Sequence, residues 1–115
     1  LFPNLRELQH RRAGQTNGGG QQMLAIARTL IGNPRLVLLD EPSEGLAPVI
    51  VEALTATVLE LKRQGLSMLV AEQNLRFVAA AAYRACVLES GHLRFVGPMQ
   101  RLLEDAALRQ AYLGV

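Results

Sequence analysis

The most constraining feature of the sequence is an aliphatic run that ends in two adjacent carboxylates. The residues Leu36–Leu39 are all apolar, and Asp40 and Glu41 follow them directly. Such a run is typical of a strand buried on both faces, as in the parallel sheets of α/β proteins. Ligands of these sheets bind at the carboxyl ends of the strands. We therefore expect Asp40 and Glu41 to lie where a phosphate-bound metal and an attacking water meet; the simpler alternative is a solvated acidic turn.

Size and composition indicate an ordinary globular domain. The 115 residues suffice for one core, and 50% of them are apolar and 19% charged. The net charge of +2 comes without an aromatic-rich basic surface, so nucleic acid is not an expected partner. The single cysteine, Cys86, excludes an internal disulfide framework. No membrane span or signal peptide is visible, and because the chain begins at Leu1 rather than methionine we expect a fragment.

The remaining pattern alternates helices and strands, which indicates an α/β fold. Apolar residues at helical spacing, aliphatic runs and turn residues predict these elements: helix 21–31, strand 36–40, helix 48–64, strand 67–71, helix 75–82, strands 84–89 and 92–96, and helices 98–104 and 106–112. Strand–helix–strand order implies a right-handed parallel crossover, and we expect the hairpin to add to one edge of that sheet.

Three polar signals follow one another in a fixed order. A glycine-rich turn, Asn17–Gly20, precedes a helix for which Asn17 is a natural N-cap. One strand then ends in Asp40 and Glu41, and a second strand ends in Glu72–Asn74. A helix amino terminus with glycine amides favours anions. Each signal alone has a simpler explanation: a flexible turn, a solvated acidic turn and a surface amide.

Together with the sequence between them, these signals resemble the ATP-binding subunits of ABC transporters over essentially the whole chain. A signature-like stretch, Thr16–Gln22, leads through a helix to a Walker B strand, and a D-loop-like segment, Glu41–Pro48, follows. Three short motifs resemble the branched-chain amino acid importer subfamily: Ser-Glu-Gly-Leu-Ala-Pro, the triplet Glu-Gln-Asn and the terminal segment Ala111–Gly114.

The resemblance implies a fold class and a division of the chain. The chain would be the C-terminal half of a P-loop ABC-type nucleotide-binding domain, with a parallel sheet, helices and an added edge hairpin. Residues 1–31 would hold the end of the helical subdomain and the signature helix, and residues 32–115 the C-terminal part of the RecA-like ATPase core.

For the acidic pair, the resemblance implies chemistry on ATP. In this family two subunits sandwich two nucleotides head to tail. Asp40 would hold Mg²⁺ through its water shell, and Glu41 would act as general base toward the attacking water. Gln73 stands where most of the superfamily has a switch histidine. Its amide can donate a hydrogen bond to the γ-phosphate but cannot become a cation, so pH dependence from such a histidine should be missing; the alternative is a solvated loop amide.

Two further segments would contact nucleotide across the dimer. Ser43 and Gly45 would belong to the D-loop, for which a plain strand-to-helix turn is the alternative. The five residues Thr16–Gly20 replace the usual Leu-Ser-Gly-Gly-Gln or -Glu signature. By resemblance, the nucleotide-binding residues within it would be Asn17, Gly18, Gly19 and Gly20. Three substitutions in five leave open a degenerate paralogue that does not hydrolyse ATP.

No G-x-x-x-x-G-K-[ST] loop occurs in the 115 residues. The chain alone should therefore neither bind ATP tightly nor hydrolyse it, whereas the parent subunit would couple ATP hydrolysis to branched-chain amino acid uptake. Implied partners are a second ATP-binding subunit (identical or different), an integral membrane permease and an extracytoplasmic solute-binding protein, at the cytoplasmic face of a bacterial inner membrane. A non-transport ABC ATPase of DNA repair or translation is a further alternative.

Overall fold

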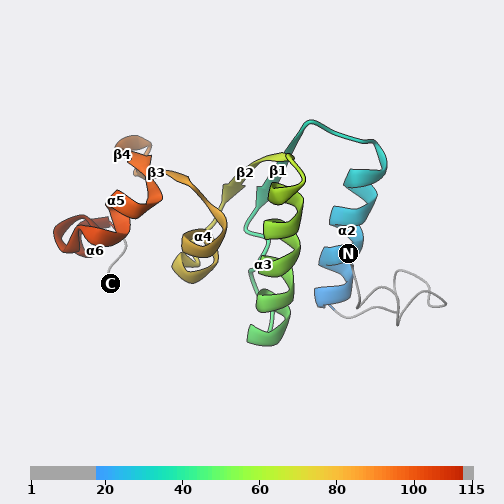
Figure 1. The fold of residues 1–115 in the computed structure, drawn as a ribbon. Helices are drawn as coiled ribbons and strands as arrows, with labels where there is room; N and C mark the ends of the chain where they lie inside the picture. Colours follow the sequence, from blue (N-terminus) through green and yellow to red (C-terminus); the bar gives the residue numbers. More distant parts are fainter. Residues whose placement is uncertain (1–17, 113–115) are drawn as a thin grey trace. The chain divides into compact units, whose positions relative to one another are not determined.

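The computed structural model describes residues 18–112, which fold into alternating helices and strands (Figure 1). In chain order the elements are α2 (Gly18–Ile31), β1 (Leu36–Asp40), α3 (Pro48–Arg63), β2 (Ser67–Ala71), α4 (Leu75–Ala81), β3 (Arg84–Glu89), β4 (His92–Pro98), α5 (Met99–Glu104) and α6 (Ala106–Tyr112). They confirm the predicted α/β fold. Within the described range, no helix has the length and apolar character needed to span a membrane.

The chain divides into two compact units, one through Asn74 and one from Leu75 onward. The boundary expected at residues 31 and 32 concerns subdomains of a larger protein, and it stays a prediction. Each unit has its own two-stranded sheet. All the described residues of the predicted site belong to the first unit.

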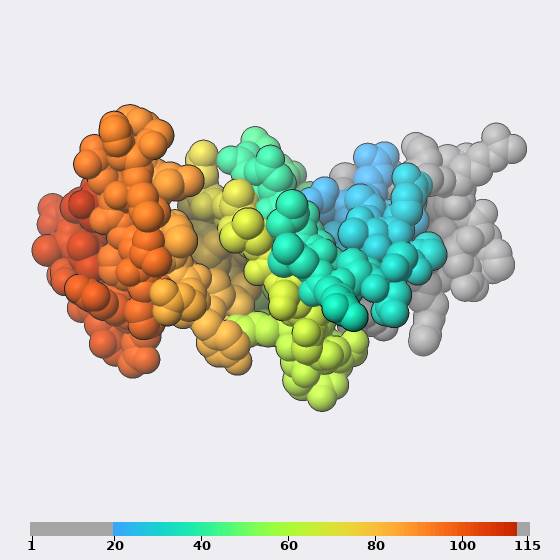
Figure 2. Space-filling model, turned by 90° about the horizontal axis from the view of Figure 1, so that it is seen from above, coloured from blue at the N-terminus to red at the C-terminus, as the bar shows by residue number. Residues whose placement is uncertain are grey.

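In the first unit, β1 and β2 pair in parallel, with α3 as the connection between them. The register sets Leu36 opposite Ser67 and Asp40 opposite Ala71. At the amino ends, the Ser67 N–H donates to the Arg35 carbonyl oxygen at 3.3 Å. Figure 2 views this end, where the cyan segment between α2 and β1 lies at the surface. Because parallel strands end on the same side, the segments that follow Asp40 and Ala71 begin side by side.

The helices of the first unit bury the faces that their sequences predict. In α2, Met23 and Ile26 are buried, and in α3 the buried apolar residues include Leu54 and Val58. Pro48 occupies the first turn of α3, where its missing N–H leaves no bond unmade. Beyond α2, Asn33 takes a positive φ of 52° and its N–H donates to the Leu30 carbonyl oxygen, which ends the helix.

The expectation of strands buried on both faces is wrong for the described residues. Val37 is only 4% exposed, whereas Leu38 is 68% and Leu69 65% exposed. Successive side chains of a strand point to opposite faces, so this alternation indicates one covered and one open face. The register places Leu38 beside Leu69 on the open face. An aliphatic run therefore predicted the strand correctly but not what covers it.

In the second unit, β3 and β4 form an antiparallel hairpin around Ser90 and Gly91. Both turn residues have positive φ, 49° and 78°, as a type I′ turn requires. The hairpin forms a two-stranded sheet within this unit, and its addition to an edge of the first sheet stays a prediction. One core cluster of this unit consists of these buried side chains: Phe95, Met99 and Leu102.

A stability prediction follows from the packing of α3. Leu54 is 0% exposed, so Leu54→Ala should lower the free energy of unfolding by about 2–5 kcal/mol, through lost burial and a residual cavity. The exposed Val49 in the same helix serves as control, because Val49→Ala should change stability by about 0.5 kcal/mol or less. Urea unfolding monitored by circular dichroism measures both. Equal effects of the two variants would contradict the assigned packing.

Candidate functional site

The acidic pair lies at the point where β1 ends. Asp40 is the last residue of the strand and is exposed. Glu41 extends the pairing by one step, because its N–H donates to the Ala71 carbonyl oxygen at 2.7 Å. Its φ of 45° lies in the left-handed region, which is uncommon for a residue with a side chain. The backbone thus turns sharply at Glu41 while remaining bound to the end of β2.

A tight turn follows and leads into α3. The Glu44 N–H donates to the Glu41 carbonyl oxygen at 3.1 Å, and the Leu46 N–H donates to the Ser43 carbonyl oxygen at 3.3 Å. Gly45 adopts a φ of 71°, a conformation that glycine takes without steric cost. Gly45 thus supplies the positive φ in this turn. Its contact with a partner subunit's nucleotide stays a prediction.

The carboxylate of Glu72 connects this turn with the segment after β2. One oxygen, Oε2, accepts hydrogen bonds from the backbone N–H of Ser43 at 3.1 Å and from its hydroxyl at 2.7 Å. The other oxygen, Oε1, accepts from the backbone N–H groups of Gln73 at 3.0 Å and Asn74 at 3.3 Å. Ser43 is only 7% exposed. The serine hydroxyl proton is thus already donated within the chain.

The two glutamates differ in their proton affinity. Burial raises the pKa of Glu72, but the hydrogen bonds from Ser43, together with those from the Asn74 and Gln73 amides, outweigh it and hold the pKa below its ordinary value of 4.5. A side-chain hydrogen bond with Glu44 and the charge of that carboxyl group raise the pKa of Glu41, and burial and the charges of Asp40 and Glu72 add to the rise. Glu72 is therefore the more firmly ionised group.

The structure brings some of the predicted residues together. Asp40 ends β1 and Glu41 and Ser43 follow it, whereas Gln73 follows β2 and has an exposed side chain. Asn17 lies outside the described residues. The glycines Gly18–Gly20 form the first turn of α2 rather than a turn before it, because the helix begins at Gly18. Figure 1 shows α2 and α3 both beginning on the lower side of this unit.

The role of Glu72 was missed by the sequence reasoning, which treated it only as part of a polar triplet. The sequence signal that could have indicated this role is the position of Glu72 directly after the second strand. In a parallel pair in which Asp40 faces Ala71, the residue after the second strand lies beside the turn that follows the first. A carboxylate there and a serine in that turn form a natural donor–acceptor pair.

Asp40 fits the magnesium site that the resemblance implies. Over residues 18–112, no group of three His, Cys, Asp or Glu side chains forms a closed metal cage. Mg²⁺ does not need one, because it keeps several waters and binds one or two carboxylates together with substrate phosphates. An exposed carboxylate at the end of a parallel strand suits that mode of binding.

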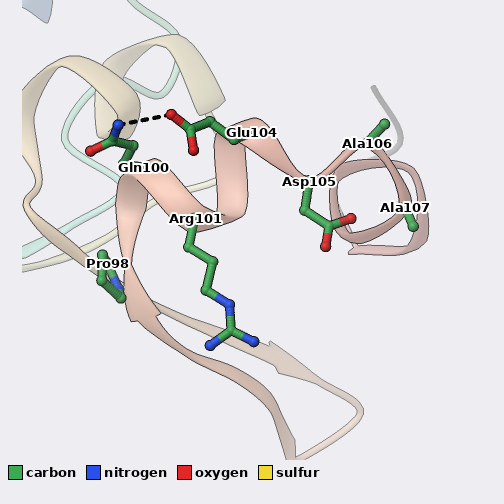
Figure 3. A pocket seen from close by; sticks show the side chains of 7 residues that line it. All are labelled: Pro98, Gln100, Arg101, Glu104, Asp105, Ala106 and Ala107. Carbon is green, nitrogen blue, oxygen red and sulfur yellow. Dashed lines mark hydrogen bonds between the residues drawn. The ribbon is translucent and has the colours of Figure 1, made fainter.

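The second unit contains an open depression that none of the predicted site residues lines (Figure 3). Its lining residues are Pro98, Gln100, Arg101, Glu104, Asp105, Ala106 and Ala107. Their polar groups serve the local helices: the Gln100 amide donates to Glu104 at 2.8 Å, and Asp105 accepts the Leu108 N–H at 3.0 Å.

The hydrogen bonds to Glu72 predict a measurable titration. Ser43→Ala removes one donor to the ionised form, so it should raise the pKa of Glu72 toward 4.5. The stability that Glu72 contributes is fully present above its unfolded pKa and is lost as pH falls through its lower folded pKa, so in the variant this loss should be smaller and should be complete at a higher pH. Carboxyl NMR titration measures the pKa. Thr55→Ala, which removes a hydroxyl bonded to Val51 in α3, is the control; an unchanged Glu72 pKa in Ser43→Ala would contradict the prediction.

Several known proteins are similar to this chain in sequence. A family model described as ABC transporter matches residues 3–44. The chain is 45% identical, over 99% of its length and 49% of the relative's, to the high-affinity branched-chain amino acid transport ATP-binding protein BraG of Pseudomonas aeruginosa. It is 35% identical, over 85% of its length and 41% of the relative's, to the lipopolysaccharide export system ATP-binding protein LptB of Escherichia coli.

A solved structure of similar fold supports the same relationship. The ATP-binding cassette of an ABC transporter in its ADP conformation matches 99% of this chain and 46% of its own, with a TM-score of 0.81 and 30% identity. The chain thus spans about half the length of the relatives it matches. By this sequence similarity and shared fold, the chain is similar to about half of an ABC transporter ATP-binding protein.

Proposed function

We propose that the chain is the C-terminal part of an ABC importer ATPase that couples ATP hydrolysis to the uptake of branched-chain amino acids. The observation that carries this proposal is the 45% identity to BraG across 99% of the chain. The probable branched-chain amino acid transport ATP-binding protein LivF of Archaeoglobus fulgidus, 34% identical over 99% of the chain, supports the same substrate class.

The site residues divide into those after β1 and those after β2. Asp40 would hold Mg²⁺, and Glu41 would accept the proton of the attacking water. Gln73 would donate a hydrogen bond to the terminal phosphate. ATP supplies the transferable phosphoryl group, and Mg²⁺ neutralises its charge. The exposure of Asp40 and Gln73 leaves both side chains accessible to a nucleotide.

Further residues would act across a dimer of ATP-binding subunits. Ser43 and Gly45 would approach the partner subunit's nucleotide through the turn between β1 and α3. Gly18–Gly20 and Asn17 would contact that nucleotide at the start of α2. The assembly would include a membrane permease and an extracytoplasmic solute-binding protein, and the subunit would lie at the cytoplasmic face of the inner membrane.

A second candidate function is lipopolysaccharide export, which the similarity to LptB favours. Deleting the gene that encodes the chain and measuring uptake of radiolabelled leucine separates the two. Loss of leucine uptake, restored by the intact gene, supports the importer; unchanged uptake together with a defect in lipopolysaccharide at the cell surface supports the exporter. A paralogue with a degenerate signature is recognised by absent phosphate release from the purified full-length protein.

The general-base role predicts a specific catalytic defect. In the full-length protein, Glu41→Gln should leave ATP binding largely intact and nearly abolish turnover, because the amide keeps the shape but cannot accept the proton. Phosphate release and equilibrium binding of a fluorescent ATP analogue measure the two properties. Glu52→Gln, an exposed substitution in α3, serves as control. Undiminished hydrolysis by the Glu41 variant would exclude the proposed role.

The missing phosphate-binding loop predicts the behaviour of the 115 residues by themselves. Without a cradle for the β- and γ-phosphates, the purified chain should release phosphate no faster than its own Glu41→Gln variant. A coupled phosphate assay at saturating ATP and Mg²⁺ tests this. Hydrolysis that the Glu41 substitution abolishes would show that the chain is sufficient for catalysis.

A further inference from the structure

The carboxylate of Glu72 joins the two segments that carry the proposed catalytic side chains. Its Oε2 accepts two hydrogen bonds from Ser43, in the turn that begins at Glu41. Its Oε1 accepts the backbone N–H groups of Gln73 and Asn74. Four donors on one carboxylate use both of its oxygens. The side chain therefore fixes the backbone of both segments at once.

We propose that Glu72 is a positioning residue that couples the turn carrying Glu41 to the segment carrying Gln73. This inference rests on the proposed ATPase function and deepens it. Glu72 itself need not touch nucleotide, since its oxygens are directed at Ser43 and at the backbone of its own segment. A shift of either segment would be transmitted to the other through this single group.

The backbone around Glu41 explains why such a restraint is needed. Glu41 has a φ of 45°, which a residue with a side chain adopts only when its surroundings enforce it. Its N–H is held by the Ala71 carbonyl oxygen, directly before Glu72, and Ser43 is held by the Glu72 side chain. Two anchors from the end of β2 thus fix the turn on both sides of Pro42, which is buried.

The Glu72→Gln variant tests the role of the carboxylate, because it replaces that group with an amide of similar shape. An amide has one oxygen and one NH₂ group, so it can accept the bonds on one side but turns a donor toward the donors on the other. In the full-length protein, kcat should fall roughly ten- to a hundredfold, the range found when partners that orient functional side chains are removed, with the KM for ATP changed less than about twofold. The control is Glu52→Gln, which should retain the kcat of the unmodified protein.

Amide hydrogen exchange provides a readout that does not depend on ATP. In Glu72→Gln, protection should fall at Ser43 or at Gln73 and Asn74, according to which side the amide oxygen serves. The amides of α3 should be unchanged. Loss of protection throughout α3, or a kcat per folded molecule equal to that of the unmodified protein, would overturn the proposal, because Glu72 would then serve stability alone.

A double-mutant comparison tests the connection through Ser43. Ser43→Ala should lower kcat in the unmodified background and have little further effect in a Glu72→Ala background, since that truncation removes the shared hydrogen bond. Independent, additive losses would overturn the coupling. If the unmodified full-length protein releases no phosphate, the proposed function fails. The positioning role of Glu72 is then tested by hydrogen exchange alone, and unchanged protection at Ser43, Gln73 and Asn74 in Glu72→Gln would overturn it.

Discussion

The parallel pairing of β1 with β2 is the constraint on which the site depends. Because Asp40 faces Ala71, both strands end at the same level, and the two polar segments that follow them start as neighbours. The hydrogen bond from the Glu41 N–H to the Ala71 carbonyl oxygen extends this pairing past the end of β1. A shift of one residue in register would move every side chain of one strand to the other face and would separate Ser43 from Glu72.

Negative charge gathers at this edge of the sheet, and the structure distributes it unevenly. Four donated hydrogen bonds stabilise the ionised form of Glu72. Glu41 has Glu44 and Asp40 near it, and their carboxyl groups raise its pKa. Groups of like charge so close together favour a cation or a proton between them. At this edge of the sheet, Glu72 therefore anchors the backbone, whereas Asp40 and Glu41 stay available to a ligand.

The open face of the first sheet is the second consequence of the topology. Leu38 and Leu69 lie side by side there, although the sequence around them is as apolar as that of a strand covered on both sides. Burial of a strand depends on the elements that pack against it, and the strand's own sequence does not specify those elements. The hairpin of the second unit is the opposite case, because its turn at Ser90 and Gly91 is set by the local sequence.

The sequence by itself determined the order and type of the elements. Helical spacing in α2 and α3, the aliphatic runs of β1 and β2, and the position of Pro48 act locally, over distances that a short stretch of chain controls. It also singled out Asp40, Glu41 and Gln73 as polar residues at strand ends. Only the tertiary structure decided that Glu72 bridges the two segments, because a hydrogen bond between residues 43 and 72 exists only once α3 has returned the chain to the edge of β1. The covered face of the sheet was decided in the same way, by packing between elements that the local sequence does not encode.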